Sequence, residues 1–126
     1  MAATQYKLVF FVPPENLEDV KSAIFAAGAG RYPGSGNYTE CAWQSTGLGQ
    51  FRPGDTANPH VGEVGKLEQL DEVRVETLCV GLETTRKAVG ALIKAHPYEE
   101  PAWQKEKSRL FKGSSTIKVH LGAISI

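Results

Sequence analysis

The run His96-Pro97-Tyr98-Glu99-Glu100-Pro101 brings an imidazole, a phenol and two carboxylates together within six positions. Imidazole nitrogen and carboxylate oxygen are common ligands of zinc and other divalent metals. His96, Glu99 and Glu100 are therefore candidate ligands of a divalent metal, the one cofactor that the sequence suggests. The flanking prolines restrict the backbone on both sides of these side chains.

An alternative interpretation explains the same run without a metal. No second histidine lies close in sequence, so further ligands would have to come through the fold, from Cys41 or His60. A histidine that ends a helix and hydrogen-bonds across a subunit contact accounts for His96 equally simply. We favour this second interpretation over the metal site.

A glycine-rich stretch forms the second candidate site, because nine of the 13 glycines fall between residues 28 and 65. We expect a loop of more than 20 residues after the second strand, and such loops are uncommon unless they have a function. Glycine amides beside an arginine suit an anionic group, and a phenyl ring offers a stacking face. The candidate ligand-binding residues are Gly47, Gly49, Phe51, Arg52 and Asn58.

Two interpretations of this loop stay open. As a binding loop it would hold a small anionic ligand or an acidic surface of a protein partner. As a structural loop it would bury Phe51 and pair Arg52 with an acid such as Glu63 or Glu76. Standard phosphate loops are excluded, because Gly65-Lys66 is followed by Leu67 and the other glycine pairs lack the third glycine of a dinucleotide fingerprint.

The spacing of apolar residues predicts the elements that position these candidates. Residues 6–12 are typical of a strand buried in the middle of a sheet, and a helix follows from about residue 15 to Gly28. Strands are expected at 38–46, 73–80 and 101–105, and a second helix from about residue 83 to Pro97, with Val89, Leu92, Ile93 and His96 on its apolar side. The order is βαββαβ, an α+β ferredoxin-like sandwich.

The C-terminal part of the sequence is treated as a separate segment. Residues 5–103 form the expected domain, and residues 104–126 form a basic link and an extra C-terminal strand at 116–125. This segment holds five Lys or Arg and one Glu. Over the whole chain 14 basic and 14 acidic side chains cancel, so nucleic acid is not an expected partner.

Cellular location is inferred from what the sequence lacks. No apolar run is long enough to cross a membrane, and residues 1–12 do not have the pattern of a signal peptide. We therefore expect a cytoplasmic protein with no membrane contact. Cys41 and Cys79 lie among apolar neighbours and are interpreted as buried free thiols rather than metal ligands or a disulfide.

These motifs resemble one known module, the insert domain of the NGG-interacting-factor-three-like (Nif-three-like, YqfO-type) proteins, which also occurs alone. The resemblance covers residues 6–103, and the module is similar to the CutA and PII signalling proteins. It rests on Val9-Phe10-Phe11-Val12-Pro13, Ala26-Ala27-Gly28-Ala29-Gly30, Gly47-x-Gly49-x-Phe51-x-Pro53, Asn58-Pro59, Gly62-x-x-Gly65 and His96-Pro97-Tyr98-Glu99-Glu100-Pro101.

The resemblance implies a CutA/PII-like fold and a homo-oligomer, most simply a trimer. Full-length relatives hold a dinuclear metal site in flanking domains that residues 1–126 do not contain, so their hydrolase-like activity is not implied here. We expect a non-enzymatic, oligomeric binding or regulatory module for a small ligand, a metal ion or a protein partner. The alternative is a metal-dependent enzyme whose site forms between subunits from the loop and residues 96–100.

Overall fold

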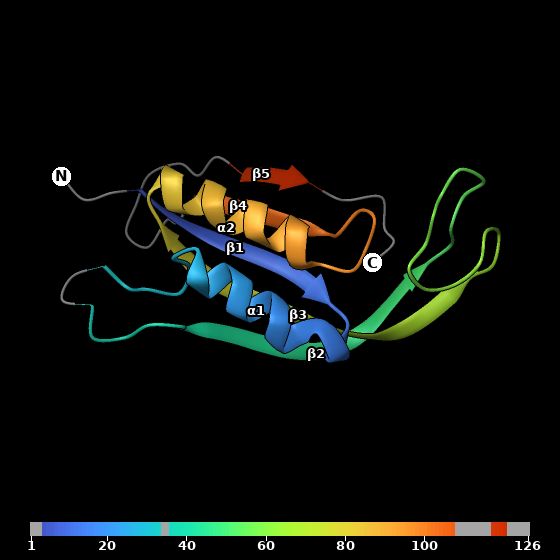
Figure 1. Cartoon of the computed structure of the whole chain (residues 1–126), viewed down its shortest axis with the longest axis horizontal. Helices are drawn as coiled ribbons and strands as arrows, with labels where there is room; N and C mark the ends of the chain where they lie inside the picture. Colours follow the sequence, from blue (N-terminus) through green and yellow to red (C-terminus); the bar gives the residue numbers. More distant parts are fainter. Residues whose placement is uncertain (1–3, 34–35, 108–116, 121–126) are drawn as a thin grey trace.

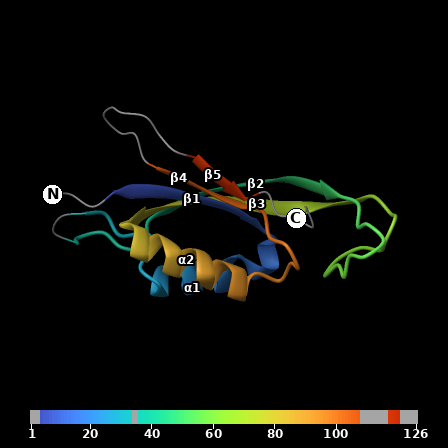
Figure 2. The same cartoon turned by 90° about the horizontal axis from the view of Figure 1, so that it is seen from above.

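The chain folds as one antiparallel sheet with two helices packed on one of its faces (Figures 1 and 2). The computed structural model describes residues 4–33, 36–107 and 117–120. The strands lie in the order β2-β3-β1-β4-β5. The elements along the chain are β1 Gln5–Val12, the 3-10 helix η1 Pro14–Asn16, α1 Leu17–Ala26, β2 Ala42–Phe51, β3 Glu68–Val80, α2 Leu82–Ala95, β4 Trp103–Lys107 and β5 Ile117–His120. The predicted ferredoxin-like fold with an extra C-terminal strand is confirmed.

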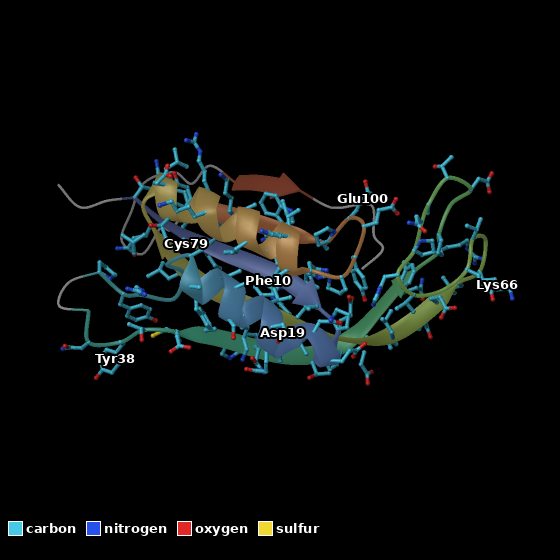
Figure 3. The ribbon with its side chains drawn as sticks, viewed as in Figure 1. Phe10, Asp19, Tyr38, Lys66, Cys79 and Glu100 are labelled. Carbon is cyan, nitrogen blue, oxygen red and sulfur yellow. The ribbon has the colours of Figure 1, made fainter. Side chains whose placement is uncertain are left out.

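The core lies between the sheet and the two helices. β1 is the central strand, and its residues Leu8, Phe10 and Val12 are fully buried under the helices (Figure 3 labels Phe10). Val75 of β3 and Leu92 of α2 are also fully buried in this cluster. Each large apolar side chain of this layer contributes about 1.5–3 kcal/mol to the stability of the fold when it is buried.

The second face of the sheet has no helix on it (Figure 2). Side chains on this face alternate with the core residues, as the two-residue period of a strand requires. Lys7 and Arg74 both pair with the Glu76 carboxylate there, at 3.2 and 3.1 Å, and the Arg74 guanidinium lies over the Phe11 ring. These charged side chains occupy part of the sheet face that carries no helix.

The hairpin of β2 and β3 is longer than expected and changes where the glycine-rich residues lie. β2 begins four residues later than the predicted strand at 38–46 and continues through Phe51, and β3 begins at Glu68 instead of residue 73. Ladder pairing from Gly47↔Glu72 to Phe51↔Glu68 accounts for the extension. The loop is therefore limited to residues 52–67, and the expectation of more than 20 loop residues is wrong.

Beyond the end of β1, this hairpin continues as an arm, here defined as residues 47–72. The last ladder pair between β1 and β3 joins Val12 to Val73, so the arm has no third strand beside it. Figure 1 shows it extending past the end of β1, and in Figure 3 Lys66 lies near its tip. The opposite end of the molecule carries the segment before β2, where Tyr38 is labelled in Figure 3.

Three smaller expectations are corrected or limited by the structure. Ile93 is half exposed, because it lies about 100° around α2 from the buried Leu92. β4 crosses the proposed division between residues 103 and 104, since it pairs with β1 from Trp103 to Lys107. β5 pairs with β4 inside the predicted strand at 116–125, and the rest of that strand lies outside the described residues.

The two cysteines are free thiols with different surroundings. Cys79 is fully buried in the core, and burial raises the pKa of its thiol to about 11. Cys41 lies one residue before β2 and is only half buried, so the expectation that it sits buried in a strand is wrong for this residue.

Candidate functional site

The segment of residues 96–101 links the end of α2 to β4 and passes the end of β1 (Figure 1). α2 stops at Ala95 because His96 adopts an extended backbone with ψ of 138°, the conformation favoured before proline. The Phe11 amide donates to the carbonyl of Ala102 at 3.3 Å. The segment is thereby tied to the last residues of β1.

His96 is buried, and both of its ring nitrogens have hydrogen-bond partners. Nδ1 accepts the backbone N–H of Tyr98 at 3.1 Å, and Nε2 lies 2.6 Å from the carbonyl oxygen of Phe11. Because Nδ1 is the acceptor, Nε2 carries the proton and donates it to Phe11. The ring is therefore neutral, and burial is the main cause that lowers the pKa of His96, followed by the opposing effect of the Phe11 carbonyl.

This geometry bears on both interpretations of the histidine. The helix-ending histidine does hydrogen-bond to a distant backbone group, but the partner is Phe11 of the same chain rather than a group across a subunit contact. With both nitrogens engaged, the ring has no lone pair free for a metal. Among residues 4–33 and 36–107, no group of three or more His, Cys, Asp or Glu side chains is arranged to hold a metal ion.

The two further ligands considered from the sequence, Cys41 and His60, lie at different distances from the segment 96–101. Cys41 precedes the first residue of β2, whereas His96 bonds to Phe11, which lies level with a β2 residue four positions beyond Cys41 and is separated from β2 by β3. Four residues of strand span roughly 13 Å, so Cys41 cannot share a metal ion with His96. His60 does approach the segment, since its ring centroid lies 6.2 Å from that of Tyr98. Metal binding by His96, Glu99 and Glu100 stays a prediction.

The loop and the segment 96–101, two motifs separate in the sequence, meet in the structure. The backbone N–H of Asn58 donates to Oε2 of Glu99 at 3.0 Å. The Tyr98 ring contacts two imidazoles, those of His60 and His96, and its centroid lies 4.8 Å from that of His96. These contacts hold the loop of the arm against the body of the molecule.

A buried carboxylate that the sequence analysis missed lies at this junction. Glu72 is 3% exposed, and its Oε2 makes no hydrogen bond. Tyr98 is close enough for its hydroxyl to affect the pKa of Glu72, but that hydroxyl also lacks a well-aligned hydrogen bond. Burial raises the pKa of Glu72 to about 7, and the Tyr98 hydroxyl opposes part of that rise. Nothing in the sequence distinguishes Glu72 from the neighbouring acids Asp71 and Glu76.

The five candidate ligand-binding residues divide into two groups. Gly47, Gly49 and Phe51 lie in β2, and Phe51 is buried, as the structural interpretation of the loop predicted. Arg52 and Asn58 lie in the loop, where Arg52 Nη1 donates to the carbonyl of Gly65 at 2.8 Å. The expected acidic partners are engaged elsewhere, because Glu63 pairs with Lys66 and Glu76 pairs with Lys7 and Arg74.

Among the described residues, none of the helices is both long and apolar enough to cross a membrane.

Sequence and structure comparisons identify relatives over most of this chain. No protein-family model matches it. It is 45% identical over 98 residues to the GTP cyclohydrolase 1 type 2 homolog of Halalkalibacterium halodurans, covering 78% of this chain and 25% of that protein. It is 49% identical over 98 residues to the Bacillus subtilis protein of the same name, covering 77% and 25%. The chain thus spans about a quarter of the length of these relatives.

Solved structures agree with these relatives. A Bacillus cereus protein related to NIF3 superposes with a TM-score of 0.65 at 35% identity, over 85% of this chain and 30% of that one. The periplasmic divalent cation tolerance protein CutA from Archaeoglobus fulgidus gives 0.56 at 13% identity, over 87% of both chains. GlnK from B. subtilis gives 0.51 at 11% identity, over 90% of this chain and 96% of that one. The chain is therefore a relative of the NIF3-related proteins over about a quarter of their length, with the ferredoxin-like fold that CutA and GlnK share.

Proposed function

We propose that this chain is a non-enzymatic binding module that works as a homo-oligomer, with copies associating along β2. The observation that carries the proposal is the nature of this edge strand. β2 has ten residues, none of them charged and none a proline, and nearly all are exposed. Natural edge strands are normally protected by charges, prolines or bulges, because unpaired backbone groups at an edge recruit other strands.

Exposed apolar side chains on the same hairpin support this proposal. Trp43 is 58% exposed and Leu48 is 67% exposed, both on β2. Val64 and Leu67 of the arm are also exposed. Tryptophan is enriched at the energetic centres of protein interfaces, so Trp43 is the expected anchor. A closed trimer, predicted from the resemblance, would leave no such edge uncovered.

Replacing Trp43 with lysine tests this assembly. We expect the wild type to be larger than the 13.7 kDa monomer at micromolar concentration, and the Trp43→Lys variant to dissociate with at least about a 30-fold weaker assembly constant. Light scattering coupled to gel filtration measures both. Ile93→Lys, a matched change of a half-exposed apolar residue on α2, should leave the mass unchanged. A monomeric wild type would contradict the proposal.

The second part of the proposal concerns what the assembled module binds. Arg52 is exposed at the start of the loop, and one of its N–H groups is used on the Gly65 carbonyl. A guanidinium has five N–H donors, so this bond orients the group and leaves donors for an anion. We propose that Arg52 receives a carboxylate or phosphate of a small ligand or of an acidic partner.

Alanine at position 52 separates a binding role from a structural one. With inorganic phosphate as the probe, Arg52→Ala should lose the calorimetric binding signal while the unfolding free energy changes by less than about 1 kcal/mol, because the bond to Gly65 is exposed. Arg86 is also an exposed arginine, but it lies on α2, so Arg86→Ala should still bind phosphate. Dissociation of Arg52→Ala into monomers, or equal phosphate binding by both variants, would eliminate this role.

A further inference from the structure

Glu72 occupies the base of the arm, where the hairpin leaves the rest of the sheet. The neighbouring residue Val73 is the last residue of β3 paired with β1, through Val12. Glu72 itself pairs only with Gly47 of β2. A change in the position of this side chain therefore acts at the point about which the arm would move relative to the body.

Residues of the arm and residues of the body both enclose the Glu72 carboxyl. On the arm side it lies over Gly49, so close that a Cβ built there would overlap Oε1 of Glu72. On the body side it faces Tyr98, which is 5% exposed. The side chain thus bridges the arm and the segment 96–101.

No cation neutralises this carboxyl in the described part of the chain. None of the ion pairs there includes Glu72, and Arg74 on the same strand is already paired with Glu76. The other titratable groups around the junction are Glu15 of η1, which acts on Tyr98, and the rings of His60 and His96. The Glu99 carboxylate accepts a hydrogen bond from the Asn58 amide. An ionised Glu72 would therefore be a buried, uncompensated charge.

We propose that the Glu72 carboxyl is a proton-operated latch: protonated, it keeps the arm docked on the segment 96–101, and ionised, it releases the arm. Separation from Tyr98 returns the ionised carboxylate to water and removes the cost of burying an unpaired charge. That movement breaks the two contacts that join the loop to the segment, the Asn58–Glu99 hydrogen bond and the contact between the His60 and Tyr98 rings.

The sign and range of the effect follow from the pKa of Glu72. In the docked form it is about 7, and in the released form it returns toward the ordinary value of 4.5. The docked form thus holds the proton more tightly, and the equilibrium constant for release rises about tenfold per pH unit between these values and levels off above 7. His96 acts in the opposite sense, because its lowered pKa favours the docked, neutral ring and protonation in acid disfavours it.

Amide hydrogen exchange measured by NMR between pH 5.5 and 8, corrected for the intrinsic rate, tests the latch. The reporter is the amide of Asn58, which donates across the junction to Glu99. Its protection should fall about tenfold per pH unit up to pH 7. The Gly65 amide donates within the loop to Pro53 and should keep constant protection, so it is the internal control.

Two variants isolate Glu72 from the histidines. Glu72→Gln cannot ionise, and the Asn58 amide in this variant should lose the pH dependence. Tyr98→Phe removes the hydroxyl that lowers the pKa of Glu72, so the midpoint should move to higher pH. Equal pH dependence in the wild type and Glu72→Gln, or a carboxyl ¹³C titration of Glu72 with a midpoint near 4.5, would overturn the latch. If Glu72→Gln does not fold, an unmoved or lowered midpoint in Tyr98→Phe overturns it instead.

Discussion

Replacing His96 with alanine should lower the free energy of unfolding by about 3 kcal/mol. The imidazole accepts the Tyr98 amide and donates to the Phe11 carbonyl, so its removal leaves two buried backbone groups without partners. Each such group costs about 1–3 kcal/mol. Denaturant unfolding at pH 7.5, where the wild-type ring is neutral, measures the loss, and the melting temperature should fall by roughly 10 °C.

Two further substitutions test whether the lost hydrogen bonds cause the lower stability of His96→Ala. Glutamine at position 96 offers one donor and one acceptor, so His96→Gln should recover part of the stability. Ile93→Ala shortens a half-exposed residue of the same helix and should change stability little. A His96→Ala variant as stable as the wild type would show that the two hydrogen bonds contribute nothing. If wild-type chain binds zinc and this variant, still folded, does not, the metal hypothesis gains its missing support.

The pH dependence of stability checks the same residue independently. Because burial lowers the pKa of His96 in the folded chain, the unfolded chain binds the proton more tightly. His96 therefore contributes stability that is present above the ordinary value of 6.5 and is lost as the pH falls below it. The part of the acid-induced loss that comes from His96 should be absent in His96→Gln.

Alanine at position 49 should destabilise the protein by about 2 kcal/mol, whereas alanine at position 47 should not. The two glycines lie on the same strand and the same face, but their surroundings differ. A Cβ at Gly49 would occupy the place of the Glu72 carboxyl, and a Cβ at Gly47 would meet nothing within 4 Å. Gly49→Ala must displace a buried side chain, a change that typically costs about 1–3 kcal/mol. Gly47→Ala should be neutral or slightly stabilising, because alanine restricts the unfolded chain.

A double-mutant cycle shows whether Glu72 causes the difference. Glu72→Ala removes the carboxyl that the new methyl group meets, so Gly49→Ala should cost much less in that background. The expected coupling is at least about 1 kcal/mol, measured by urea unfolding at pH 6. If Gly49→Ala lowers the free energy of unfolding equally with and without the Glu72 side chain, contact with Glu72 is not the cause of the destabilisation. Equal costs of Gly47→Ala and Gly49→Ala would contradict the packing itself.

Local sequence patterns determined the elements and their order. The uninterrupted apolar run around Leu8 and Phe10 predicted a strand in the middle of a sheet, and the structure places β1 between β3 and β4. Pro97 predicted the end of α2, because proline restricts the preceding residue and cannot continue the hydrogen-bond ladder. Helix and strand periods depend on neighbours within a few residues, so they are visible in the chain itself.

The limits of β2 and β3 were less visible, because they depend on pairing between strands. Gly47 and Gly49 have low strand propensity, and alone they indicated a loop. In the fold they are held by ladder partners in β3, from Leu70 to Glu72. Cross-strand pairing thus overrides local preference, and it placed Gly47, Gly49 and Phe51, three of the five candidate ligand-binding residues, in the edge strand β2.

The junction at the base of the arm was decided only by the tertiary structure. His96 finds its acceptor 85 residues away in Phe11, and Asn58 meets Glu99 across 41 residues. Sequence spacing identified His96 and Glu99 as candidates by type, but it could not supply these partners. Glu72 gave no signal at all, because its pKa is raised by burial, which only the packed chain produces. Burial and proximity are properties of the packed chain, and they turn an ordinary strand carboxylate into the group expected to control the arm.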